Sequence, residues 1–231
     1  MFSRSGAHKM KKPKYADVPR ADVLNDPCIV LARSIDLLKR TQALDFQLQR
    51  CFKLKSLLLT LWNDESIRAW RAVGADAGGM LQRSLIHEML LLCAHLVDET
   101  RSSSSIVNCH KECFNPHLKS GPFKNFYAPL YQDLKANAKK IGSLRNSLIA
   151  HQDYEWLQGS LWKNLENDKN HEMDGSFVWS DLWDLMTLFT YYVNLCHLLL
   201  GTASHEFETL FTDIEGAEAI RGALIAAHSK P

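Results

Sequence analysis

The sequence predicts an all-α protein, an antiparallel helical bundle built around long central helices. Apolar residues recur at helical spacing through most of the chain, and no stretch shows the alternation or hairpin signal of β-strands. At 231 residues, 46% of them hydrophobic, the chain is long enough to bury a core of its own. We expect one helical domain over residues 21–231, with 203–231 as a C-terminal helical appendage, behind a tail of residues 1–20.

The tail is set apart by its charge. Residues 1–20 carry six Lys or Arg and one Asp, whereas the rest of the chain carries 21 basic and 25 acidic residues. Pro13, Pro19 and the lack of periodicity predict a solvated, poorly ordered segment, and the alternative is a basic arm that docks on nucleic acid or a partner. The tail lacks the apolar region of a secretory signal, and no segment has the composition of a membrane span. We therefore expect a cytoplasmic protein that stays out of the membrane, with its six cysteines reduced and mostly buried.

Two long helices are predicted in the first half of the chain. Asp26-Pro27 combines a capping side chain with a proline suited to the first helical position, and neither Gly nor Pro follows before Trp62. Residues 27–62 therefore form one long helix, or two with a soft joint. Its core stripe comprises Leu37, Leu44, Leu48 and Phe52. A second helix starts at Asn63 or Asp64, and three glycines (Gly74, Gly78 and Gly79) weaken its middle.

The second half predicts three further helices before a final one. A short helix over 106–114 ends at Asn115-Pro116, and a long helix follows from about 124 to about 155, with Pro129 as an alternative start. Its core stripe comprises Leu130, Leu134, Ile141, Leu144 and Leu148. The helix over 180–200, closed by Gly201, carries two apolar stripes, so it is covered on both sides, either centrally in the bundle or at a dimer interface. The last helix is signalled by the capping-box spacing of Thr212 and Glu215.

One stretch carries chemical information, at the C-terminal part of the helix over 124–155. It reads Leu144-Arg145-Asn146-Ser147-Leu148-Ile149-Ala150-His151-Gln152-Asp153. An arginine has a planar fork matched to phosphate oxygens, and a histidine has an unperturbed pKa of about 6.5, suited to proton transfer near neutral pH. The amide of Asn146 can hold either group by hydrogen bonds, and Asp153 can orient His151.

This stretch resembles the signature of the HEPN superfamily, in which an arginine, usually followed by a polar residue, precedes a histidine by a short but variable spacing; Arg145, Asn146 and His151 fit it. The wording R-N-x-L-I-A-H-x-D, after a helix that ends in L-L-x-x-x-L-V-D-E over residues 91–99, is most similar to the abortive-infection branch. The resemblance covers most of residues 27–202 in helix order. It implies a homodimeric helical bundle that cleaves RNA without a metal or cofactor and leaves 2′,3′-cyclic phosphate ends. Arg145 and His151 would be the catalytic residues, with Asn146 in support and Asp153 in a supporting position.

A biological role is implied in the same way. The resemblance suggests phage defence or a toxin, with a neutralising protein partner. A six-residue step places Arg145 and His151 about 120° apart around a regular helix, so one helix does not bring their tips together. A site shared across a two-fold dimer solves this, and the spacing is compatible with it.

Two other interpretations stay open. In the first, Arg145 and His151 only make interhelical hydrogen bonds, and the chain is a non-catalytic helical dimer that binds a partner protein or a nucleotide. In the second, Cys109 and Cys113 share a helix face with His117 one turn on and hold a structural zinc ion. The paired spacing of common zinc modules is absent, so buried, reduced cysteines are the favoured interpretation.

Overall fold

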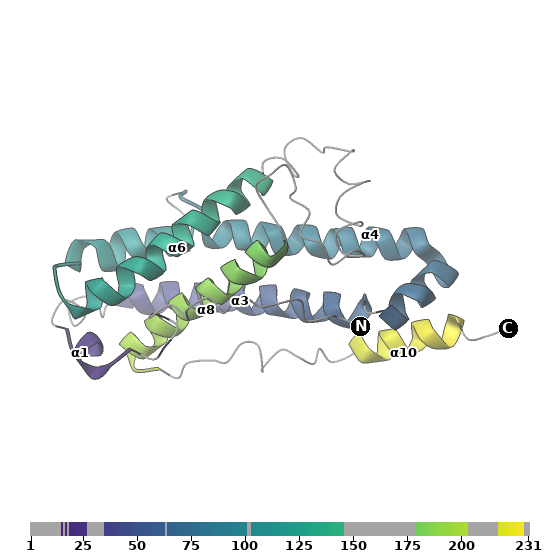
Figure 1. Cartoon of the computed structure of the whole chain (residues 1–231), viewed down its shortest axis with the longest axis horizontal. Helices are drawn as coiled ribbons and strands as arrows, with labels where there is room; N and C mark the ends of the chain where they lie inside the picture. The colour runs from purple at the N-terminus through teal and green to yellow at the C-terminus, as the bar shows by residue number, and fades with distance from the viewer. Residues whose placement is uncertain are drawn as a thin grey trace, which may run out of the picture.

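The computed structural model describes residues 15, 17, 19–26, 35–62, 64–100, 103–145, 179–202 and 217–228. Every regular element within these ranges is a helix, which confirms the all-α prediction. Two long helices, α3 (Ile35–Leu61) and α4 (Asp64–Leu96), lie side by side along the length of the molecule (Figure 1). None of the described helices is both long and apolar enough to cross a membrane.

Three further helices pack on this pair. Helix α6 (Pro122–Arg145) lies against α4 and α8 (Trp179–Leu200), and α8 lies against α3. Helix α10 (Ala217–His228) contacts α3 and α4 at the end where they are joined (Figure 1). The C-terminal appendage is therefore helical over 217–228, while the predicted cap at 212–215 falls outside the described residues.

The α3–α4 connection is fixed by tryptophan. The Trp70 indole N–H donates to the Leu61 carbonyl at 3.0 Å, and its ring stacks on Trp62 with centroids 5.8 Å apart. Further from the turn, the Cys51 and Cys93 Sγ atoms approach to 3.9 Å, so the two helices are also in contact there. This short connection at 62–63 agrees with the predicted second helix start at Asn63 or Asp64.

Two of the glycines that were expected to weaken α4 have distinct roles. Gly74 has φ 175° and ψ 72°, and the helix is kinked there. Gly78 is helical, but a Cβ at this position would stand 2.7 Å from the Trp70 ring. The kink therefore lies at Gly74, where a Cβ would make only an ordinary contact. At Gly78, in contrast, the Trp70 indole packs closely against the helix backbone.

Helix α8 is the inner helix of the described bundle. One of its predicted apolar stripes is buried throughout, and it comprises Leu182, Leu185, Phe189, Tyr192, Cys196 and Leu199. In the other stripe Met186, Val193 and His197 are buried, whereas Trp183 and Leu200 are partly exposed. Contacts with α3 and α6 place the helix centrally among the described residues, and a dimer interface at α8 stays a prediction. The helix ends as expected: Gly201 has φ 69°, and the Thr202 N–H donates to the His197 carbonyl at 2.9 Å.

The start of α6 agrees with the expected one, but its cap was not predicted. The helix begins at Pro122, close to the expected start at about 124, and the alternative start at Pro129 is wrong because Pro129 lies inside the helix. Gly121 precedes Pro122 and has no side chain to cap the helix; instead the Asp26 carboxylate accepts from the Phe123 N–H at 3.2 Å. Asp26, expected to start the helix that follows it, is thus buried at the N-terminus of α6, beside the short helix α1 (Ala21–Leu24). Residues 27–34 are not described, so the first long helix is seen only from Ile35.

The end of the expected tail is not wholly solvated. The Tyr15 side chain is buried, its hydroxyl donates to the Asp133 carboxylate on α6, and its ring meets Tyr191 of α8 edge to face. Pro19 is buried as well. Of the 1–20 segment, residues 1–14, 16 and 18 are not described.

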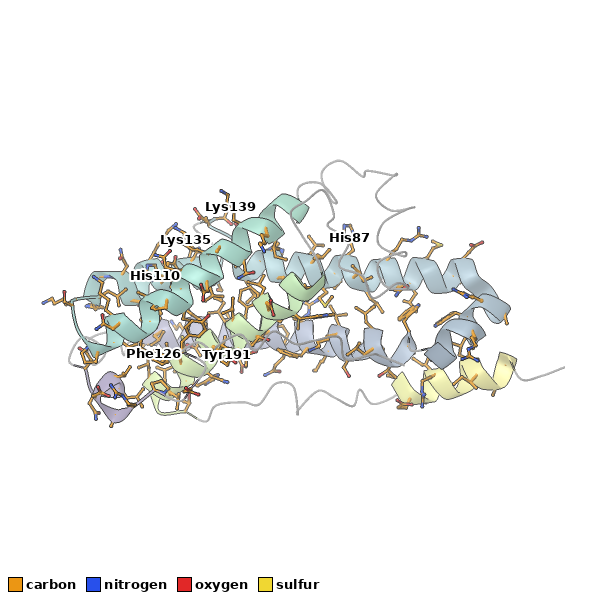
Figure 2. All side chains as sticks on the ribbon, viewed as in Figure 1. His87, His110, Phe126, Lys135, Lys139 and Tyr191 are labelled. Atoms are coloured by element: carbon orange, nitrogen blue, oxygen red, sulfur yellow. The ribbon has the colours of Figure 1, made fainter. Side chains whose placement is uncertain are left out.

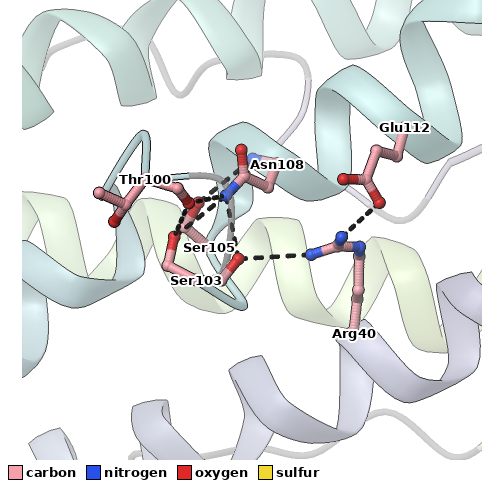
Figure 3. Close-up of polar contacts among 6 residues, drawn as sticks. All are labelled: Arg40, Thr100, Ser103, Ser105, Asn108 and Glu112. Carbon is pink, nitrogen blue, oxygen red and sulfur yellow. Dashed lines mark hydrogen bonds and ion pairs between the residues drawn. The ribbon is translucent and has the colours of Figure 1, made fainter.

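The predicted short helix over 106–114 is divided in two. An α-helical turn, α5 (Ile106–Cys109), continues as a π-helical turn, η2 (His110–Phe114), and then as a 3-10 turn, η3 (Asn115–His117). Asn108 holds the preceding loop by donating to the Thr100 carbonyl at 2.6 Å and the Ser103 carbonyl at 3.0 Å (Figure 3). Arg40 of α3 bonds the same Ser103 carbonyl and pairs with Glu112, which ties η2 to α3.

Candidate functional site

The predicted catalytic residues fall at the edge of the described chain. Arg145 is the last residue of α6, and nothing is described of its side chain. Asn146, His151 and Asp153 lie in the segment 146–178, beyond the described part. Whether Arg145 and His151 meet, within one chain or across a dimer, therefore stays a prediction.

The alternative zinc ligands do not form a metal site. Cys109 and Cys113 are buried, and a hydrogen bond to Cys109 together with burial raises the pKa of the Cys113 thiol far above its ordinary value. His117 lies apart from them in η3, and no three His, Cys, Asp or Glu side chains in the described ranges are grouped to hold an ion. The five described cysteines are free and buried, as the favoured interpretation expected.

His110, which no sequence motif indicated, is held by contacts with two tyrosine side chains. His110 is the first residue of the π-helical turn, the kind of local irregularity that often accompanies function. Its Nδ1 lies 2.9 Å from the hydroxyl of Tyr127, which is fully buried. The imidazole also stacks on Tyr131, with ring centroids 3.7 Å apart. Two tyrosines of α6 thus hold the imidazole of η2 against that helix.

The charge state of His110 follows from its surroundings. Burial and, to a smaller extent, the positive charges of Lys135 and Lys111 together lower its pKa from 6.5 to about 4. The ring is therefore neutral at pH 7. A group with this pKa is a poor proton shuttle at neutral pH, so His110 does not take over the role predicted for His151.

The C-terminal half of α6 is basic. Between residues 133 and 145 it carries Lys135, Lys139, Lys140 and Arg145 against a single acid, Asp133, whose carboxylate accepts the Tyr15 hydroxyl. Lys135 and Lys139, which we call the lysine row, are exposed and one helical turn apart. Figure 2 shows both on the outer edge of α6, above His110. Neither makes an ion pair with any residue that the structure describes.

Sequence reasoning passed over both features for different reasons. The lysine row had a local signal, two lysines four residues apart on a predicted helix that leads to Arg145. The bond between His110 and Tyr127 joins two elements separated by a loop, and no spacing rule predicts it. Comparisons of the chain with family models, curated proteins and solved structures found no match.

Proposed function

We propose that the chain is a metal-independent endoribonuclease of the HEPN type, with Arg145 and His151 as catalytic residues and Asn146 in support. The observation that carries the proposal is the stretch from Arg145 to Asp153, which begins on the last described residue of a long helix. The basic half of that helix supports it, because an enzyme acting on RNA needs cations near the scissile phosphate.

The chemistry assigns one task to each residue. The ribose 2′-oxygen forms a bond to the adjacent phosphorus while the bond from phosphorus to the 5′-oxygen breaks. The neutral imidazole of His151 takes the 2′-OH proton, and an imidazolium returns a proton to the departing 5′-oxygen. The Arg145 guanidinium stabilises the negative charge that gathers on the phosphoryl oxygens. The products are a 2′,3′-cyclic phosphate and a 5′-OH end.

The same proposal includes a homodimer. Because a regular helix separates the two side chains by about 120°, a groove formed by two copies offers both residues to one phosphate. Phage defence or toxin action, controlled by a neutralising protein, is the biological role that we propose with it.

A non-catalytic binding protein is the second candidate. The observation that favours it is the exposure of three large apolar side chains on α3, namely Ile35, Leu38 and Phe46, which are 73%, 37% and 62% accessible. Ile35 and Phe46 stand about three helical turns apart and so lie on one face of the helix, with Leu38 close to Ile35. Apolar side chains that gather on one exposed face are a feature of protein-binding surfaces. In this case Arg145 and His151 would have structural roles only.

The test is cleavage of a mixed set of RNAs in excess EDTA. We expect His151→Ala and Arg145→Ala each to lower the cleavage rate by about 100-fold or more. The matched control is His87→Ala, since His87 is exposed on α4 and belongs to neither site. Loss in the two variants, retention in the control and cyclic phosphate ends would support the enzyme. A folded wild type that cleaves none of the RNAs would refute it and favour the binding protein.

A further inference from the structure

The basic charge on α6 is concentrated where helix stability does not require it. Cations stabilise a helix through its dipole only within the last turn. Arg145 is the last described residue of α6, so Lys135 stands at least ten residues before the helix end. Lys135 and Lys139 also have the same sign one turn apart, which is mildly unfavourable for the helix itself. The lysine row therefore calls for an explanation other than helix stability.

The acid closest in sequence, Asp133, makes no ion pair with either lysine of the row among the described residues. Asp133 accepts the hydroxyl of Tyr15, which is buried against α6 and α8. The other nearby acids are engaged elsewhere: Glu99 lies 4.0 Å from Lys111, and Glu112 pairs with Arg40. The positive potential at the row is felt by its neighbour, because Lys135 helps to lower the pKa of His110.

An aromatic edge borders the row. Tyr131 precedes Lys135 by one turn on the same helix face, is only half-buried, and carries the stacked His110 ring. Cations that follow a groove or ridge beside aromatic rings are the combination by which proteins hold single-stranded nucleic acids. A neutral imidazole adds a hydrogen-bonding edge without the desolvation cost of a second charge.

We propose that Lys135 and Lys139 bind the phosphate backbone of single-stranded RNA and lead the strand along α6 toward Arg145. The helix rise places the two lysines about 6 Å apart along the axis, and Lys139 about 9 Å before Arg145. One row of cations on one helix contacts one strand, whereas duplex recognition requires contacts to both backbones across a groove. The inference rests on the proposed function for the identity of the strand and for the direction toward Arg145.

The experiment measures binding apart from cleavage. In a His151→Ala background, fluorescence anisotropy follows a short labelled oligouridine between about 50 and 200 mM salt. The test variant is Lys135→Gln with Lys139→Gln, and the matched control is Lys39→Gln with Lys119→Gln, which removes the same charge from exposed lysines on α3 and in the loop before α6.

We expect the test variant to bind about tenfold more weakly at the lowest salt, with the slope of log affinity against log salt shallower by about 1.4, the value for two lost phosphate contacts to a single strand. The control should retain the wild-type slope. Equal weakening of both variants, or equal affinity of the parent for a duplex of the same length, would overturn the proposal.

The two proposals fail separately. Suppose that the wild type cleaves no RNA, but that substitution of the lysine row still changes the salt slope of binding. The proposed enzyme activity is then refuted, and RNA binding by the lysine row stands. If instead the wild type cleaves RNA while the row variant keeps the wild-type affinity and KM, RNA binding by the row is refuted and the enzyme activity stands. If both hold, the row variant raises KM more than it lowers kcat.

Discussion

Replacing Gly78 with alanine tests whether the α3–α4 connection depends on the Trp70 ring. A Cβ built at Gly78 stands 2.7 and 2.8 Å from two carbons of the indole, closer than carbon atoms approach one another. The indole cannot simply swing away, because its N–H bonds the Leu61 carbonyl and its face lies on Trp62. Gly222 on α10 is the matched control, since nothing lies within 4 Å of a Cβ there.

Three contributions decide whether Gly78→Ala raises or lowers the free energy of unfolding. In a helix interior, alanine is worth about 1 kcal/mol more than glycine. Two costs oppose this gain at Gly78. Overpacking against the indole costs about 1–3 kcal/mol, and a weakened Trp70–Leu61 hydrogen bond costs about 1 kcal/mol. We therefore expect Gly78→Ala to lower the free energy of unfolding by about 1–3 kcal/mol, and Gly222→Ala to raise it by about 0.5–1 kcal/mol.

Urea denaturation followed by far-UV circular dichroism measures both changes. Tryptophan fluorescence serves as a second probe, because the strain at Gly78 is directed at Trp70. If Gly78→Ala stabilises the chain as much as Gly222→Ala does, the close approach of the indole is not a constraint and the reasoning is wrong.

Three further predictions concern the site and its supports. NMR titration should give His110 a pKa of about 4. Because the unfolded chain binds this proton near pH 6.5 and the folded chain only near pH 4, the free energy of unfolding is highest above pH 6.5 and decreases as the pH falls from 6.5 to 4. The expected decrease is about 1–2 kcal/mol, because solvent screens a half-buried ring. Asp26→Ala should cost about 1–2 kcal/mol in urea unfolding through the lost cap on α6, and Asp26→Asn, which keeps an acceptor, less. Tyr15→Phe should cost about 1 kcal/mol in the same assay, and Tyr15→Ala more, because only alanine also removes the ring from Tyr191.

The helices were readable from the sequence because their apolar period is local. The core stripe of α3 was named from spacing alone, and Leu44 and Leu48 are buried as expected. Glycine indicated the kink in α4, though spacing could not say that Gly74, and not Gly78, would take it. The cap of α6 was missed because it comes from Asp26, which a local rule assigns to the helix that follows it in sequence. A carboxylate caps whichever helix end the fold brings to it.

The sequence predicted candidate site residues only where they form a contiguous motif. Arg145, Asn146 and His151 stand within seven residues, so a resemblance could name them together. His110 and Tyr127 belong to different elements, and the hydrogen bond between them exists only because η2 packs against α6. The shift of the His110 pKa likewise depends on burial and on Lys135, neither of which a sequence position reveals.

The burial of Tyr15 closes a long loop in the chain. Its hydroxyl bonds a carboxylate 118 positions further along the sequence, and its ring meets Tyr191 of α8. A contact of such sequence separation forms only after the intervening helices have come together, because closing the loop earlier costs chain entropy with nothing to offset it. We therefore expect the Tyr15 contact to form late in folding, so that its loss speeds unfolding more than it slows folding.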